Sequence, residues 1–382
     1  MFLSNSDLVE LVAFRRELHR APEISGEERE TAKAVLGFLT PNKPDQIVTD
    51  LGGHGVAAIY EGSEPGPTVL VRCELDALPI EELSESEHRS QVPGKGHLCG
   101  HDGHMAIVAA LSRGLGRSRP RRGRAILLFQ PAEETGAGAA AVIADAKFEE
   151  IAPDYAFSLH NRPGLPLGYV ALSEGYANCA SRGLRIVLTG HTSHASTPEH
   201  GLSPMAAVAK LMPALTALGP GGALDEDYAL VTVTHAAMGE PAFGIAPGRA
   251  EIWATLRTLT DAQMGALCER AEGLVRQAAA ESGLSVETDY HDVFHHCENN
   301  PEAVALLHQA LDDEKMAHGP TTSPSRGSED FGLFGRKAKS AMFLLGSGEN
   351  CPHLHNPDYD FPDDIIAPGA RVFMRTLRNL LG

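Results

Sequence analysis

The stretch Thr68-Val-Leu-Val-Arg-Cys-Glu-Leu75 has the composition of a buried strand, and it belongs to a repeating pattern. Similar short apolar runs cover residues 56–60, 125–130 and 155–160. Residues 105–116, between the second and third runs, have the apolar content of a buried helix. Strands that alternate with helices predict an α/β fold, in which chemistry gathers in the loops beyond the carboxyl ends of the strands.

The pattern on either side of these strands predicts two domains. Helices are expected at residues 7–19 and 26–39, ahead of the first strand. From about residue 182 a second series begins, in the order βαββαβ of an open-faced sandwich. Its expected strands are 184–189, 230–234, 250–259 and 285–290, and its expected helices are 204–218 and 261–282. Helices at 301–312 and 367–381 and a strand at 340–345 then return the chain to its first domain.

Composition limits the classes of partner. The formal net charge of −18 argues against nucleic acid or an anionic membrane as partner, since either requires a basic surface. No apolar segment approaches the roughly twenty residues that span a bilayer, and residues 1–10 do not resemble a signal peptide. The six cysteines follow no disulfide pattern, which suits a reducing compartment. We therefore expect a cytoplasmic protein.

Metal donors are concentrated in two short segments. Lys95-Gly-His-Leu-Cys-Gly-His-Asp-Gly-His104 holds three imidazoles, a thiol and a carboxylate, and Phe129-Gln-Pro-Ala-Glu-Glu134 adds two adjacent carboxylates. Zinc and its neighbours accept these donors, and two loops are needed to surround an ion. Cys99 and His101 can turn toward one ion if they lie on an irregular loop. The two segments together predict a metal-dependent hydrolase.

The motifs, taken in order along the chain, carry a resemblance to a known family. They are Cys99-Gly-His-Asp-Gly-His104, Gln130-Pro-Ala-Glu-Glu-Thr135, Leu159-His160, Gly327-Ser-Glu-Asp-Phe331 and Leu354-His-Asn-Pro357. This combination resembles the M20 metallopeptidase family, specifically its amidohydrolase branch. The resemblance implies a zinc-peptidase-like catalytic domain of residues 1–181 and 292–382. It also implies an inserted lid and dimerisation domain of residues 182–291.

The resemblance further implies a site with two divalent metal ions per subunit. The implied ligands are Cys99, His101, Glu134, His160 and His355. A thiolate ligand favours zinc, with manganese, cobalt and nickel left open. The implied reaction is cleavage of the amide bond of an N-acyl amino acid, with an acetyl, benzoyl or related acyl group, by a metal-activated water.

Adjacent carboxylates on one loop can point in different directions, which separates the roles of the two glutamates. Glu134 can bind metal while Glu133 acts as general base and acid. The segment Gly190-His-Thr-Ser-His-Ala-Ser-Thr-Pro198 resembles the family segment whose histidine reaches the partner's active site, and His194 occupies that position in preference to His191. A homodimer, or a higher homo-oligomer, follows from that role.

Two further residues are candidates for substrate binding. Arg257 offers a planar fork that matches a substrate carboxylate. His235 could donate a hydrogen bond in place of a missing amide, because Gly244 stands where many relatives carry Asn. A second departure from the family pattern is Glu74, which replaces the usual Asp, whereas Asp76 is retained and is expected to orient a metal-binding histidine.

Other functions remain open at this point. A dipeptidase or aminopeptidase-like enzyme of the same metal class would need similar residues, because amide and peptide bonds differ only in what flanks them. A cysteine hydrolase would use Cys99 as nucleophile with His101 and Asp102 in support, but it leaves the other metal donors unexplained. A non-catalytic binding protein is expected to lack Glu133 or a metal ligand, and all are present.

Overall fold

A computed structural model describes residues 2–382 of the chain. The chain divides into two compact units, and each is described by itself. The first unit contains the residues up to Ala177 together with Cys297–Thr322 and Asp330–Gly382. The second unit contains Asn178–His296 and Ser323–Glu329.

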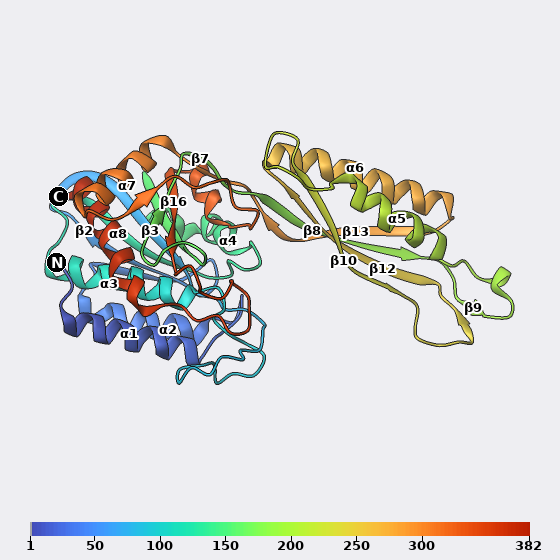
Figure 1. Ribbon diagram of the computed structural model, residues 1–382, viewed down its shortest axis with the longest axis horizontal. Helices are drawn as coiled ribbons and strands as arrows, with labels where there is room; N and C mark the ends of the chain where they lie inside the picture. Colours follow the sequence, from blue (N-terminus) through green and yellow to red (C-terminus); the bar gives the residue numbers. More distant parts are fainter. Residues whose placement is uncertain (1) are drawn as a thin grey trace. The chain divides into compact units, whose positions relative to one another are not determined.

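A mixed sheet of eight strands forms the centre of the first unit (Figure 1). Its strands are β1 (Gln46–Leu51), β2 (Gly55–Glu61), β3 (Glu64–Glu74), β4 (Arg122–Gln130), β5 (Tyr155–Arg162), β6 (Val170–Ala171), β15 (His318–Gly319) and β16 (Lys339–Gly346). Their order is β1-β2-β4-β3-β5-β16-β6-β15. The neighbours β4-β3, β3-β5 and β5-β16 are parallel, so their carboxyl ends meet at one edge of the sheet.

Helices and short 3-10 turns bury both faces of this sheet. Along β2, Val56, Ala58 and Tyr60 belong to one hydrophobic core, and the alternate residues Ala57 and Ile59 belong to the other. The first core is completed by α1 (Asn5–Arg20), α2 (Arg29–Leu39), α3 (His101–Arg117), α7 (Pro301–Asp313) and α8 (Ile366–Leu381), and the second by α4 (Gly138–Ala144) and residues 331–334. A small separate sheet pairs β7 (Gly175–Asn178) with β14 (Cys297–Asn299).

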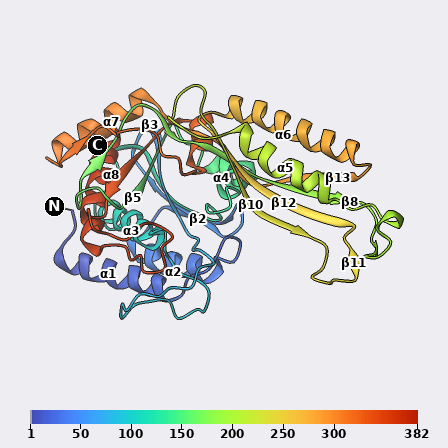
Figure 2. The ribbon, with the colours of Figure 1, turned by 45° about the vertical axis from the view of Figure 1, so that its right-hand side comes forward.

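The second unit is an antiparallel sheet covered by two helices on one face (Figure 2). Its strands β8 (Ala180–Thr189), β10 (Ala229–Met238), β12 (Arg249–Thr258) and β13 (Ser285–Phe294) lie in the order β10-β12-β8-β13. The helices α5 (Met205–Leu218) and α6 (Asp261–Glu281) share a core with β8 and β12. A short antiparallel two-stranded sheet pairs β9 (Ser193–His194) with β11 (Ile245–Ala246).

The predicted α/β class and the βαββαβ order are confirmed, and every predicted helix and strand is present. Strand β1 was not predicted, because its alternating exposed and buried residues carry little apolar signal. Helix α2 begins at Arg29 instead of at the predicted residue 26, since Gly26 has a φ of 84° that no helix allows. No helix among residues 2–382 is long and apolar enough to cross a membrane.

Candidate metal centre

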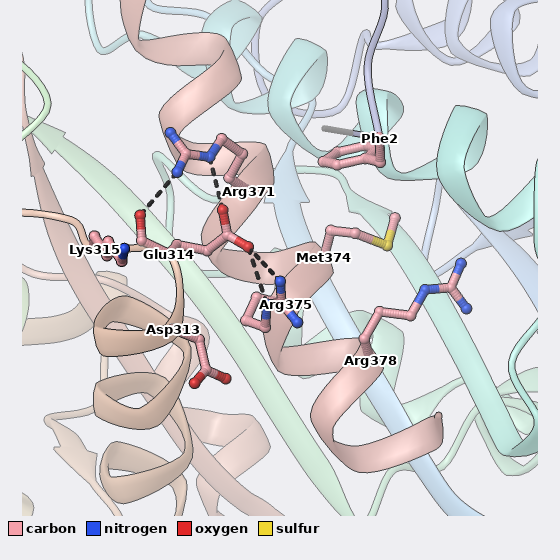
Figure 3. Close-up of a pocket in the computed structure, with 8 residues that line it drawn as sticks. All are labelled: Phe2, Asp313, Glu314, Lys315, Arg371, Met374, Arg375 and Arg378. Atoms are coloured by element: carbon pink, nitrogen blue, oxygen red, sulfur yellow. Dashed lines mark hydrogen bonds and ion pairs between the residues drawn. The ribbon is translucent and has the colours of Figure 1, made fainter.

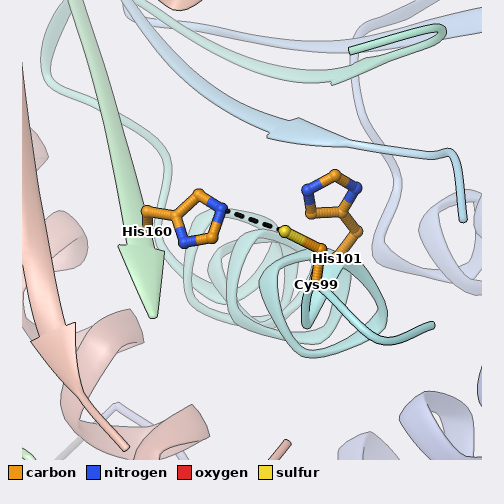
Figure 4. Close-up of side chains that lie close together, drawn as sticks. All are labelled: Cys99, His101 and His160. Carbon is orange, nitrogen blue, oxygen red and sulfur yellow. Dashed lines mark hydrogen bonds between the residues drawn. The ribbon is translucent and has the colours of Figure 1, made fainter. Parts of the chain in front are cut away.

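The first unit brings together all five predicted metal donors. Cys99 precedes α3, His101 is the first residue of α3, and Glu134 follows β4. His160 lies on β5, and His355 lies on the segment between β16 and α8. Figure 4 shows the Cys99 thiol between the two imidazoles of His101 and His160, with its Sγ 3.5 Å from His160 Nε2. Segments distant in sequence therefore supply one cluster of donors.

The donors form two overlapping groups. The donor atoms of Cys99, His101 and His160 all lie within 4.8 Å of one another, and so do those of Cys99, Glu134 and His355. Cys99 belongs to both groups. If two neighbouring ions were bound, the Cys99 thiolate could be a ligand of either.

One glycine decides how Cys99 and His101 face the same space. Gly100 has a φ of 86°, and a Cβ there would lie 2.7 Å from the Asn161 amide. Only glycine fits that position without displacing Asn161. Cys99 lies on the irregular segment before α3, but α3 begins at His101 and not at residue 105 as predicted. The left-handed conformation of Gly100 lets Cys99 and His101 face the same space, which is the role that the loop was expected to have.

Asp76 lies against His101 with both its main chain and its carboxylate. Its carbonyl oxygen lies 2.8 Å from His101 Nδ1, and its carboxylate Oδ1 lies 3.8 Å from the same nitrogen. The carboxylate also accepts hydrogen bonds from the Glu134 amide, at 2.9 Å, and from the Ser25 hydroxyl, at 2.6 Å. Asp76 thus orients two donors at once. His101 Nε2 is buried and makes no hydrogen bond within residues 2–382, as expected of a nitrogen that faces a cation.

A second buried histidine, His104, was missed as a functional residue although it lies in the quoted motif. His104 Nδ1 lies 2.6 Å from Glu74 Oε2, and its Nε2 lies 2.6 Å from Asn161 Oδ1. Glu74 is fully buried and also pairs with Arg72. The longer carboxylate at position 74 therefore reaches a histidine one helical turn beyond His101.

The two adjacent glutamates occupy different surroundings. Glu133 is buried, and one of its carboxylate oxygens lies 3.8 Å from His101 Nε2. Glu134 is close to His101 at 3.9 Å and to His355 at 3.8 Å. Only Glu134 belongs to the group that includes Cys99 and His355. Both glutamates also form a donor group with His101, so the proximity to Cys99 and His355 is what separates Glu134 from Glu133.

Electrostatics at the site disfavours a cysteine nucleophile. Burial raises the pKa of the Cys99 thiol well above its usual value, and the carboxylates of Glu134 and Glu133 raise it further. Burial also lowers the pKa of the neighbouring His160 to about 3, so its imidazole is a poor base for the thiol. A reactive thiolate needs a cationic environment. Within this protein, a bound cation is the group that could provide it.

The remaining candidates belong to the second unit. His194 is exposed on β9, and its Nδ1 lies 2.7 Å from the Ser196 hydroxyl. His235 is exposed on β10, with its ring 5.3 Å from that of Trp253. Arg257 on β12 donates to the Arg326 carbonyl at 2.9 Å and to the Ser328 hydroxyl at 2.8 Å. Arg257 makes no ion pair with a carboxylate in the part of the chain described, although burial lowers its pKa.

A separate cavity of about 410 Å³ lies beside α8, away from these donors (Figure 3). It is lined by Phe2, Asp313, Glu314, Lys315, Arg371, Met374, Arg375 and Arg378. Glu314 pairs with Arg371 and with Arg375, each at 2.9 Å. Arg378 donates to the carbonyls of Ser118, at 2.5 Å, and Arg119, at 3.1 Å. These cations hold helix ends and a turn together, and we assign no ligand to the cavity.

The chain resembles bacterial deacetylases over nearly its whole length. It is 28% identical over 372 residues to the N-acetylcysteine deacetylase of Bacillus subtilis, covering 95% of this chain and 94% of the relative. It is 30% identical over 359 residues to the N-acetyldiaminopimelate deacetylase of Bacillus velezensis, covering 93% and 96%. The corresponding enzyme of Lactobacillus helveticus is 28% identical, covering 98% of each chain.

Solved structures and a family model agree with these relatives. The YXEP protein of Bacillus subtilis, a dinuclear metal-binding peptidase from the M20 family, superposes with a TM-score of 0.81 at 25% identity and covers 99% of each chain. The model of peptidase family M20/M25/M40 matches residues 70–379. That match includes the donors from Cys99 to His355, so the chain belongs to peptidase family M20/M25/M40.

Proposed function

We propose that this protein is a metal-dependent amidohydrolase that cleaves the amide bond of N-acyl amino acids. The observation that carries the proposal is the pair of donor groups, Cys99-His101-His160 and Cys99-Glu134-His355, which share one thiol. The names of the relatives, deacetylases of N-acetylcysteine and N-acetyldiaminopimelate, support a small N-acyl amino acid as substrate. An acetyl group is the first acyl group to test, with benzoyl and related groups next.

The residues present fit two divalent cations per subunit. The donor set mixes imidazole, thiol and carboxylate, which are donors that zinc accepts readily. Manganese, cobalt or nickel could also occupy such a site. Buried His101 Nε2 makes no hydrogen bond in residues 2–382. When bound, such ions lower the pKa of a water molecule and polarise the carbonyl of a scissile amide.

Glu133 is the proposed proton carrier. It is buried beside His101 and stands outside the donor group of Cys99, Glu134 and His355. Its carboxylate can take a proton from the attacking water and deliver that proton to the nitrogen of the leaving amine. Burial of Glu133 favours this role, because transfer to a protein carboxylate competes best with bulk water where water is excluded. Asp76 acts through its contacts with His101 and Glu134.

The second unit supplies the proposed substrate contacts. His194 would donate a hydrogen bond to the developing oxyanion in the site of a partner subunit, which requires a homodimer. Exposure of the His194 ring supports a role outside its own unit. Arg257 would bind the substrate carboxylate, and its lack of a carboxylate partner in residues 2–382 supports this. His235 is a second donor on the same sheet.

The proposed setting is the cytoplasm, with neither nucleic acid nor a membrane as partner. All six cysteines are free, including the buried Cys73, Cys179, Cys268 and Cys297, and this suits a reducing compartment. The net charge of −18 opposes binding to other polyanions.

A substrate panel tests the proposal. Purified protein is incubated with N-acetyl, N-benzoyl and indoleacetyl amino acids and with dipeptides, with and without chelator, and again after zinc, manganese, cobalt or nickel is restored. The proposal expects chelator-sensitive, metal-restored cleavage of one acyl class. Preferential cleavage of dipeptides would show that the protein is a peptidase instead. Cleavage that resists the chelator would point to Cys99 as a nucleophile.

A further inference from the structure

A network of charges is centred on Arg15 of α1 and reaches the segments that carry metal donors. Arg15 is 1% exposed, one of the largest fully buried side chains among residues 2–382, and three carboxylates surround its guanidinium. Its Nε donates to Asp363 at 2.9 Å, and its Nη1 donates to Asp360 at 2.6 Å and to Asp102 at 3.2 Å. One planar fork therefore joins three carboxylates from two distant segments.

The two segments are those that carry metal donors. Asp102 directly follows His101 at the start of α3. Asp360 and Asp363 follow His355 on the segment that leads into α8. Residues 102 and 360 have no direct bond to each other in the structure, and Arg15 joins their carboxylates. The two segments also meet through Phe361, which packs against Gly103 and His104, and through the His355 amide, which donates to the Leu98 carbonyl.

The His101 side of this network has several further supports. His19, one turn after Arg15, lies with its Nδ1 2.8 Å from Asp102 and its Nε2 3.3 Å from Glu82. His101 itself is held by the Asp76 carbonyl and is fully buried. If Arg15 is lost, these contacts remain and continue to fix the start of α3.

On the His355 side, buried Tyr359 and Phe361 anchor the segment in the core, whereas the His355 ring itself has few contacts. The His355 side chain is 50% exposed, and its φ of 66° is uncommon for a residue other than glycine. Its amide donates to the Leu98 carbonyl at 2.8 Å, while Asp360 is held by Arg15 and lies 2.8 Å from His88 Nε2. A strained, half-exposed ligand depends on the anchoring of its segment, because little side-chain packing restrains it.

Stability alone does not account for an arginine in this place. Burying a guanidinium among carboxylates costs desolvation energy, and apolar residues of similar volume often replace such networks without loss of stability. Arginine differs from lysine in its rigid fork, which can hold several carboxylates in a fixed mutual geometry. That geometry is what the two metal-binding segments require.

We propose that Arg15 is a positioning residue that sets the place of His355, and so the affinity for the cation shared by Cys99, Glu134 and His355. The inference rests on the proposed metal centre. Partners that orient a metal ligand typically change metal affinity by about 10-fold to 100-fold when they are mutated. The ion bound by Cys99, His101 and His160 should be affected much less, because its ligands have supports of their own.

Cobalt titration of the metal-free full-length protein tests this proposal without substrate. The thiolate-to-cobalt charge-transfer band in the near ultraviolet reports cobalt bound to Cys99. The visible bands and the total bound cobalt follow the binding of each ion. Arg15→Lys keeps the charge but not the fork, and Asp360→Asn removes the arm toward His355 at a residue that is 31% exposed. Arg16→Lys is the matched control, because Arg16 is 42% exposed, neighbours Arg15 and pairs with Asp363 at 2.8 Å.

We expect Arg15→Lys and Asp360→Asn to weaken one of the two cobalt ions by about 10-fold to 100-fold and the other by less than about 3-fold. Arg16→Lys should bind both ions as the wild type does. Wild-type affinity for both ions in Arg15→Lys and Asp360→Asn, or equal weakening of both ions, would overturn the positioning role. Unfolded Arg15→Lys, detected by circular dichroism, leaves Asp360→Asn to decide.

The proposed function fails in a different way. If the wild type binds two cobalt ions but cleaves nothing in the substrate panel, the substrate assignment is wrong while the positioning role stands. If the wild type binds no cobalt, the metal centre itself is wrong, and the role of Arg15 is overturned with it.

Discussion

Asp76, Cys99, His101 and Glu133 of the first unit are buried, and His355 is half-exposed, whereas two of the three candidates of the second unit are exposed. His101, Asp76 and Glu74 are fully buried, each within a chain of hydrogen bonds. His194 and His235 are exposed, and His194 is held by a nearby serine. This difference indicates that the side chains of a metal centre must be held in place before the metal ion binds, because the ion requires a specific arrangement of donors. A residue that meets substrate or a partner subunit can be left accessible.

Glu133→Gln gives the largest expected effect and tests the buried side of the comparison. Removal of the proton carrier should lower kcat by about 10²-fold to 10⁴-fold, because proton transfer accounts for that much in such reactions. Metal content should stay at the wild-type value, since Glu134 and not Glu133 is the proposed ligand. Metal analysis beside steady-state kinetics checks both points. Loss of metal together with activity would reverse the roles of the two glutamates.

His194→Ala tests the exposed side. We expect kcat to fall by about 10²-fold to 10³-fold, because a donor to the oxyanion acts mainly in the transition state. His191→Ala, an exposed neighbour on the same segment, serves as control and should keep most of the activity. Because the proposed donor acts in the partner's site, mixing His194→Ala with Glu133→Gln should restore part of the activity in heterodimers. No such recovery would contradict a role across the dimer.

Arg257 is the exception within the second unit, since it is partly buried and makes no ion pair with a carboxylate in residues 2–382. Arg257→Lys should raise KM about 10-fold or more, with kcat changed less, because a lysine cannot bind a carboxylate through two parallel hydrogen bonds. The exposed Arg249 begins the same strand, and Arg249→Lys is the matched control. An N-acyl amine without a carboxylate should be cleaved equally poorly by Arg257→Lys and by the wild type. Unchanged KM in Arg257→Lys would assign the arginine to structure alone.

The smallest expected effect comes from His19 in the buried network around Arg15. It is measured as the dependence of the free energy of unfolding on pH. Burial opposes a charge on His19, but Asp102 and Glu82 outweigh it and raise its pKa from 6.5 to about 9. A raised pKa in the folded state gives stability that is complete below pH 6.5 and is lost as the pH rises through 9. The corresponding contribution is roughly 3 kcal/mol at most.

Urea denaturation at pH 6, 8 and 10 measures this contribution. The difference in the free energy of unfolding between the wild type and His19→Gln should shrink as the pH rises. The exposed His291→Gln provides a control whose difference should not follow this course. A constant difference for His19→Gln across this range would show that His19 is not charged in the folded protein.

Much of the fold followed from local patterns in the sequence. Runs such as 125–130 are apolar because their strand is buried on both faces, and the alternation of strands with helices is visible without any contact being known. Strand β1 escaped prediction because half of its residues face solvent. The helix at residue 105 was placed too late, because His101 to His104 are polar yet buried by their neighbours.

The sequence by itself determined the α/β class, the order of the elements and the types of metal donor. Only the tertiary structure decided that Asp76 holds His101 through its carbonyl, that His104 reaches Glu74 and that Arg15 joins two donor segments. Periodicity records burial, which depends on residues a few positions apart. Hydrogen-bond partners are chosen across the folded chain, and Arg15 finds its carboxylates 87 and 348 positions away. No local pattern carries that information.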